Sequence, residues 1–137
     1  MHLDFVVLGP PISNQQSTPA GRRNLVDWRA TVAAAATLRW PNPILLIDLK
    51  AVIINFYATN KPSVDVDNMS KPILDTMEKL VYKNDRQIRQ VEITHAELGG
   101  LYQIAGVSSI LVTALRANQE FVYVRIEDPV IPFPLPK

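Results

Sequence analysis

The chain has 137 residues, which is enough for one domain with a buried core, and 47% of its residues are apolar while 20% are charged. The absence of cysteine excludes a disulfide framework and any thiolate site, and two histidines are too few to suggest a zinc centre. The net charge of +1 does not by itself indicate a nucleic-acid-binding surface. No apolar run is long enough to span a bilayer, and the first residues lack the basic start of a signal peptide. We therefore expect a cytoplasmic protein without a membrane segment.

The first half of the chain predicts two strands separated by a loop and a helix. Residues 2–9 favour a strand, and residues 12–21 are polar and favour a loop. Asn24 is a good N-cap, so we expect a helix over residues 25–39. Residues 44–58 form a nearly continuous apolar run rich in β-branched side chains, which is typical of a central strand. The helix should bury a stripe formed by Leu25, Trp28, Val32, Ala35 and Leu38.

Three aspartates follow the second predicted strand. Asp65 and Asp67 are two residues apart, so both carboxylates would point to one face if they close that strand. Asp85 comes about one helix length later, and the chain can fold back to bring it to the first two. At about 4 Å and an effective dielectric constant near 20, each pair of carboxylates would repel by about 4 kcal/mol. A hard divalent cation would remove that cost, and carboxylate oxygens are the ligands it prefers.

The segment between these aspartates predicts a short amphipathic helix. Pro72 is tolerated only near the first turn of a helix, so the helical hydrogen bonds should begin close to Ser70. Lys71 and Asp75 are four residues apart and therefore lie on one side of this helix. The side expected to be buried consists of Ile73, Leu74, Met77 and Leu80.

The acidic stretch also has a simpler interpretation. An Asp-x-Asp pair before a helix often serves as an N-cap and complements the helix dipole, here with Asn68 or Ser70 as the cap. A calcium loop of the EF-hand type fits poorly, because its twelfth position would be Thr76 and not a glutamate.

The last third of the chain predicts a strand over residues 86–98, a helix over Ser109–Ala117 capped by Ser108, and a strand over residues 119–127. The tail, residues 128–137, alternates proline with apolar residues and cannot pair as a central strand. We therefore expect one α+β domain with a single mixed sheet and helices packed on it. The predicted helix and the tail carry more apolar side chains than a small monomer should expose, which predicts a homodimer.

The pattern D-x-D-N-x-x-K, from Asp65 to Lys71, is followed by Asp75 and then by N-D-x-Q-I, which contains Asp85. This ordered set resembles the RusA family of Holliday-junction resolvases. The resemblance implies that Asp65, Asp67 and Asp85 bind one or two Mg²⁺ ions, for which Mn²⁺ can substitute, and that Lys71 is required for cleavage. Asp75 would orient Lys71 or supply a fourth ligand.

Members of this family carry a proline-proline and asparagine signature after the first strand, which Pro10, Pro11 and Asn14 match. Asn14 is equally explained as a turn residue, and the arginines near it as a solvated face. His95 stands where many members carry a basic residue, so the strand predicted over residues 86–98 is less expected to bind phosphate. The residues expected to contact DNA are Asn14, Arg22, Arg23, Arg29, Lys61, Lys79 and Lys83.

The resemblance implies a magnesium-dependent endonuclease that resolves four-way DNA junctions by paired symmetric nicks in DNA recombination and repair. Two nicks require two active sites, which again indicates a homodimer. Two alternatives remain open from the residues alone. One is another metal-dependent phosphohydrolase or nuclease. The other is a non-catalytic DNA-binding module, in which the aspartates only cap a helix and face solvent.

Overall fold

The computed structural model describes residues 1–58 and 60–137. Its strands, β1 (Leu3–Leu8), β2 (Leu49–Tyr57), β3 (Ile88–Glu97) and β4 (Phe121–Glu127), form one sheet in the order β1-β4-β2-β3. β4 pairs antiparallel with both β1 and β2, whereas β2 and β3 are parallel. The mixed sheet and the α+β class are therefore confirmed.

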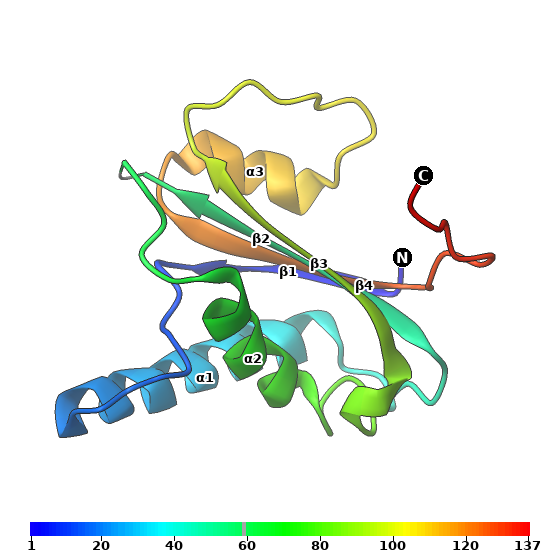
Figure 1. Cartoon of the computed structure of the whole chain (residues 1–137), viewed down its shortest axis with the longest axis horizontal. Coiled ribbons are helices and arrows are strands. Elements are labelled where there is room, and N and C mark those ends of the chain that lie inside the picture. Colours follow the sequence, from blue (N-terminus) through cyan, green and yellow to red (C-terminus); the bar gives the residue numbers. More distant parts are fainter. Residues whose placement is uncertain (59) are drawn as a thin grey trace.

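The helices α1 (Pro19–Arg39) and α2 (Val66–Met77) cover one face of the sheet, and α3 (Ser109–Ala117) covers part of the other (Figure 1). A short 3₁₀ turn, Asp85–Gln87, leads from the end of α2 into β3. The main core lies between the sheet and the first two helices, and a smaller cluster lies under α3, where the rings of Phe56 and Phe121 stack at 4.6 Å. Each large side chain buried in this way contributes about 1.5–3 kcal/mol.

α1 begins earlier than the sequence predicts. Thr18 is the N-cap, and its hydroxyl accepts a hydrogen bond from the backbone N–H of Gly21 at 2.9 Å. Pro19 occupies the first turn, where its fixed φ is favourable and its missing N–H costs nothing. The prediction of Asn24 as the cap was therefore wrong. Leu38, predicted to be buried, is 82% exposed, whereas the helix buries Ala36.

The first turns of α1 project beyond the sheet and are therefore exposed. Its residues are mostly exposed until Trp28, which is the first to be buried against the core. The early turns extend past the end of the sheet (Figure 1). α1 therefore joins a packed half to a half that remains open to solvent.

β2 is central, as predicted, but shorter than residues 44–58. Residues 44–48 lie before the strand, and Leu45 forms only an isolated bridge with Tyr82. The side-chain amide of Gln87 donates to the carbonyl oxygens of Leu45 and Ile47 at 2.8 and 2.9 Å. These carbonyls are thus satisfied by a side chain and not by a strand partner, because β3 begins only at Ile88.

α2 also begins earlier than predicted, with Asp65 at its N-cap and the backbone N–H of Met69 donating to the Asp65 carbonyl at 2.9 Å. Pro72 therefore lies inside the helix, where it cannot donate to the carbonyl of Asn68. That carbonyl instead accepts the backbone N–H of Asn14 at 2.9 Å. The loop after β1 supplies the hydrogen bond that the proline removes.

The predicted α3 and β4 are confirmed within one or two residues. Ser108 is the N-cap of α3, but its hydroxyl donates to the carboxylate of Asp4 and makes no capping bond. The buried Asp4 carboxylate also accepts a hydrogen bond from the hydroxyl of Tyr123 at 2.8 Å. Asp4 therefore fixes the start of α3 to β1 and β4.

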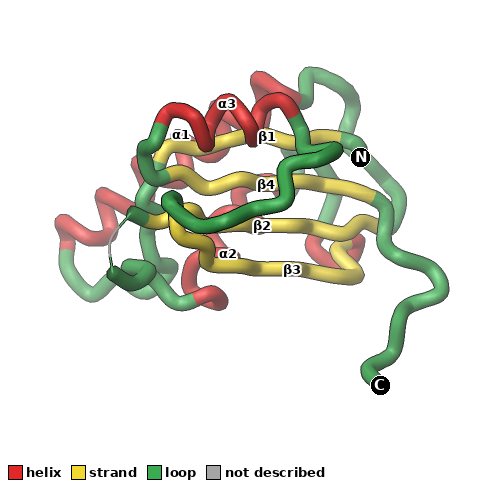
Figure 2. Tube along the Cα trace, turned by 90° about the horizontal axis from the view of Figure 1, so that it is seen from above, coloured by secondary structure: helices red, strands yellow, loops and turns green. Residues whose placement is uncertain are grey.

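The C-terminal tail, residues 128–137, forms no helix or strand and leads away from the end of β4 (Figure 2). Its residues are mostly exposed. Its first part is held by a hydrogen bond from the backbone N–H of Val130 to the side chain of Gln90 at 2.8 Å. Within residues 1–58 and 60–137, no helix is long and apolar enough to cross a membrane.

Candidate active site at the start of α2

The start of α2 lies at the edge of the sheet where β2 and β3 end. β2 ends at Tyr57 and leads through a short connection to Asp65, and the parallel β3 ends at Glu97 opposite Tyr57. The loop after β1 reaches the same place, because Asn14 is bonded to Asn68 in the first turns of α2. In sheets built from β-α-β units, ligands bind beyond the carboxyl ends of parallel strands, near the start of the helix.

Asp65 and Asp67 occupy this position. Asp65 is the N-cap residue, yet its side chain makes no capping hydrogen bond, and Asp67 follows in the first turn. Both residues are exposed, and neither carboxylate has a hydrogen-bond or ion-pair partner among the described residues. The predicted caps Asn68 and Ser70 were wrong, since the Ser70 hydroxyl donates to the Asp67 carbonyl at 3.1 Å.

The missing capping bond bears on whether these aspartates cap the helix or are available to bind a cation. A capping role requires a side-chain oxygen to accept a backbone N–H of the first turn, which Asp65 does not do. The positive end of the helix dipole still favours a negative charge here. Two carboxylates with unshared oxygens are thus available for an external ligand, and their chemistry suits a hard divalent cation.

Lys71 lies on the same exposed face of α2, four residues after Asp67 and four before Asp75. Its ammonium nitrogen is 3.2 Å from a carboxylate oxygen of Asp75, which confirms the predicted contact. The Lys71 side chain is 61% exposed. An exposed ion pair contributes at most about 1 kcal/mol, so the lysine can exchange Asp75 for a phosphate at little cost.

Asp85 lies at the other end of α2. It opens the 3₁₀ turn before β3, and its neighbour Gln87 is bonded to the segment that precedes β2. Because β2 and β3 are parallel, the start of β3 lies at the sheet edge opposite the start of α2. The expectation that the chain folds back to bring Asp85 to Asp65 and Asp67 is therefore not met within one chain. Among the described residues, no three His, Asp or Glu side chains are grouped to hold a metal ion.

The C-terminal end of α2 surrounds a buried tyrosine. The hydroxyl of Tyr82 donates to the carbonyl of Leu74. Burial, followed by the negative charges of Glu78, Asp75 and Asp85, raises the pKa of Tyr82 well above its usual value. Asp75 and Asp85 therefore share the neighbourhood of this hydroxyl. The sequence offered no functional signal for Glu78.

The residues predicted to contact DNA separate into groups around α2. Asn14 and Arg29 reach its start, because the Asn14 backbone is bonded to Asn68 and the Arg29 guanidinium donates to the Asn14 side chain at 3.3 Å. Arg22 and Arg23 are exposed on the projecting turns of α1. The lysines are all exposed: Lys61 lies in the connection before α2, and Lys79 and Lys83 follow its end.

The buried Asn55 and the half-buried His95 form a polar pair near the ends of β2 and β3, which the sequence pattern did not predict. The amide of Asn55, 1% exposed, bonds to Nδ1 of His95 at 3.1 Å, and the ring of Tyr57 meets His95 edge-on. These side chains lie on the α2 side of the sheet, at the edge where the aspartates lie. A polar residue inside an otherwise apolar strand is the signal that could have identified Asn55.

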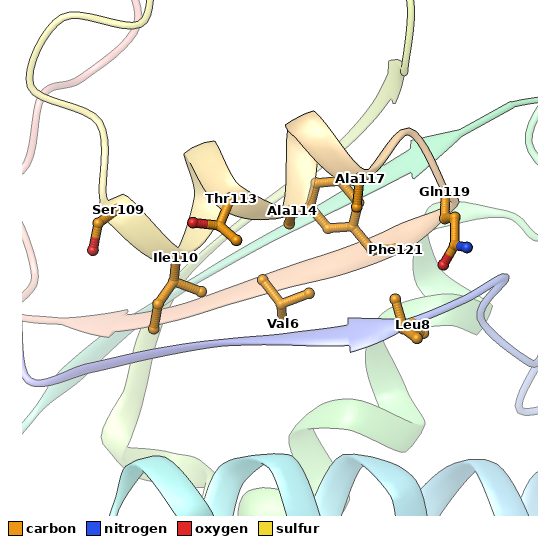
Figure 3. A pocket seen from close by; sticks show the side chains of 9 residues that line it. All are labelled: Val6, Leu8, Ser109, Ile110, Thr113, Ala114, Ala117, Gln119 and Phe121. Atoms are coloured by element: carbon orange, nitrogen blue, oxygen red, sulfur yellow. The ribbon is translucent and has the colours of Figure 1, made fainter.

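A different hollow lies on the opposite face of the sheet. It has a volume of about 350 Å³ and lies between β1 and α3 (Figure 3). Its lining includes Val6, Leu8, Ile110 and Phe121, and it contains no titratable side chain. The hollow is therefore not part of the aspartate site.

The chain matches a known protein family. The model of the endodeoxyribonuclease RusA family matches residues 12–104, which is more than half of the chain. The match includes Asp65, Asp67, Lys71 and Asp85. No protein with a curated description matches the chain. The chain therefore belongs to the RusA family of endodeoxyribonucleases.

Proposed function

We propose that this protein is a magnesium-dependent endonuclease that resolves four-way DNA junctions by paired symmetric nicks. The observation that supports it best is the pair Asp65 and Asp67 at the start of α2, whose carboxylates have no partner among residues 1–58 and 60–137 and which lie within the family match. Membership of the family accounts for the coarser part of the proposal, an endonuclease that acts on branched DNA. We place this activity in recombination and repair in the cytoplasm.

The chemistry of the donors fits Mg²⁺, with Mn²⁺ as a substitute. Asp65 and Asp67 would hold one or two ions through their free oxygens. When bound, Mg²⁺ supplies charge neutralisation at the phosphate and lowers the pKa of a water. Asp85 lies at the far end of α2 in the single chain. We propose that it joins the reaction only in the assembly with DNA or with a second copy.

Lys71 and Asp75 have separate roles in this proposal. The exposed ammonium of Lys71 stabilises the negative charge that develops on the phosphate during cleavage. Asp75 positions the lysine through its 3.2 Å contact before DNA binds. Because both residues are on α2, the lysine is fixed relative to the aspartates by the helix itself.

The proposal requires a homodimer, since one chain carries one set of these residues and resolution needs two nicks. The apolar hollow between β1 and α3 supports it, because it lies beside an edge strand with Leu8 64% exposed. Contiguous apolar surface next to an unpaired strand edge favours association. Sedimentation should give twice the chain mass of 15.3 kDa. A monomer would exclude the two-site mechanism.

A nuclease assay tests the proposed function directly. A synthetic four-way junction and a linear duplex of the same sequence are incubated with the protein, with Mg²⁺ and with EDTA. We expect paired nicks in the junction only with Mg²⁺, and tighter binding of the junction than of the duplex. Cleavage of both DNAs alike would indicate another metal-dependent nuclease. Binding without any cleavage would indicate a non-catalytic DNA-binding protein.

A further inference from the structure

The guanidinium of Arg29 is incompletely paired inside the protein. Its Nε atom is buried without a hydrogen-bond partner, and within the described residues its single hydrogen bond is the 3.3 Å contact from Nη2 to Asn14. Three other arginines have carboxylate partners, Arg39 with Asp4, Arg89 with Asp48 and Arg125 with Glu127. Arginine cannot lose its charge in a protein, so a half-buried guanidinium without an anion is costly.

Asn14 determines where this charge lies. Its backbone N–H is bonded to the carbonyl of Asn68, which is free because Pro72 cannot donate to it. Its side-chain oxygen then accepts from Arg29. Two hydrogen bonds through one residue thus connect the guanidinium on α1 to the first turns of α2, where Asp67 lies.

The space next to Asn14 suits a phosphodiester. A hollow of about 500 Å³ is lined by Asn14, Gln15, Gln16 and Ser17, all of them polar and uncharged. Amide and hydroxyl groups of this kind donate hydrogen bonds to phosphate and sugar oxygens. The carboxylates of Asp65 and Asp67 would repel an approaching strand, and the nearby fixed positive charge of Arg29 offsets that repulsion.

We propose that Arg29 binds a phosphate of the DNA strand beside the aspartate pair, and that Asn14 is the positioning residue that holds the guanidinium in place. This inference rests on the proposed function and deepens it, because it assigns one specific anchor among the basic residues. A planar guanidinium with several N–H donors matches a phosphate better than an ammonium does.

The test measures DNA binding in EDTA, so that no cleavage occurs, for a four-way junction and a short linear duplex over a series of salt concentrations. Arg29→Gln should weaken the binding of both DNAs by about tenfold. It should also reduce the slope of log affinity against log salt by about 1, the loss expected for one phosphate contact. Arg29→Lys should restore the slope but not the full affinity, since the charge returns without the guanidinium geometry. Asn14→Ala should weaken binding while the slope stays near that of the wild type.

The matched control is Arg116→Gln in the last turn of α3, an exposed arginine on the other face of the sheet, which should change neither quantity. An Arg29→Gln variant with lower thermal stability but an unchanged slope would overturn the proposal, since that is the signature of a structural arginine. If Arg29→Gln does not fold, Asn14→Ala decides the question. Its backbone bond to Asn68 remains, and unchanged affinity for both DNAs would contradict the positioning role.

The two proposals fail in different ways. A wild-type protein that binds junction and duplex equally, and cleaves neither, contradicts the proposed function. The slope measured on linear duplex still reports on Arg29 in that case. Conversely, normal junction cleavage with an unchanged slope in Arg29→Gln contradicts only the phosphate anchor.

Discussion

The two ends of α2 carry aspartates in opposite surroundings. At the start, Asp65 and Asp67 are exposed and have no protein partner in the described structure. At the other end, Asp75 is paired with Lys71, and Asp85 contributes to the negative field around the buried Tyr82. The 12-residue helix holds the two ends about 18 Å apart. Four aspartates within one motif therefore have different electrostatic surroundings.

The largest effect should come from Asp67→Asn at the start of α2. The variant keeps the shape but loses one negative charge and one strong ligand, so cleavage should fall by about a hundredfold or more. In EDTA its melting temperature should not fall below that of the wild type, because relief of the repulsion between Asp67 and Asp65 offsets the lost interaction with the helix dipole. Added Mg²⁺ should stabilise it less than the wild type. Calorimetry measures the melting temperatures with and without Mg²⁺, and the nuclease assay measures cleavage.

A structural aspartate would behave differently. Loss of an N-cap costs about 1 kcal/mol, so a destabilised variant in EDTA that retains cleavage would contradict the catalytic assignment.

Lys71→Ala should reduce cleavage without preventing Mg²⁺ binding. Cleavage should fall by about 10²- to 10³-fold, since the residue acts on the developing charge. The rise in melting temperature with Mg²⁺ should persist, because Asp65 and Asp67 are unchanged. Loss of the Mg²⁺ response together with cleavage would show that the lysine is needed to form the ion site.

Asp85→Asn tests the far end directly. In the isolated protein the Mg²⁺-dependent rise in melting temperature should remain largely intact, because the pair at the start of α2 is preserved. Cleavage should nevertheless fall, if Asp85 joins the reaction in the assembly with DNA. A loss of the Mg²⁺ response as large as that of Asp67→Asn would show that Asp85 shares the ion already in the free protein.

The smallest effect concerns the pH dependence of stability at the far end. Tyr82 has a raised pKa in the folded protein, so its proton stays bound while the unfolded chain loses it above pH 10.0. The unfolded state then binds fewer protons, and the free energy of unfolding should fall as the pH rises above that value. Tyr82→Phe should reduce this alkaline loss without affecting cleavage. The pKa of Tyr123, raised by burial to about 12, leaves a residual loss of the same sign in the variant. An identical alkaline profile would mean that Tyr82 is not the group responsible.

Much of the fold could be predicted because its signals are local. The alternation of apolar residues in β3 and the apolar run that ends in β2 depend only on neighbouring residues. The start of α1 was missed because Thr18-Pro19 and Asn24 both offer a cap, and only the bond from Gly21 to Thr18 decides between them. Residues 44–48 have the composition of a strand but pair with no strand in the described part of the chain, because β3 begins only at Ile88.

The residues of the candidate site stand in a local sequence pattern, but their arrangement in space does not follow from it. The spacing of Asp65, Asp67 and Lys71 identified the start of α2 because the helix fixes it. The position of Asp85 depends on the parallel pairing of β2 with β3, which no local pattern contains. The interior position of Pro72 depends on Asn14, which lies more than fifty residues earlier in the chain.

Pro72 has a consequence that extends beyond helix geometry. A regular helix would use every interior carbonyl for itself, and α2 would then offer nothing for a distant loop to bind. The proline leaves one acceptor open, and the loop that carries Asn14 is fastened there. The unpaired carbonyl of Asn68 in α2 is thus the point at which the loop leading into α1 is attached. Restoring the missing N–H, as in Pro72→Ala, would make the helix more regular and leave that loop without its attachment.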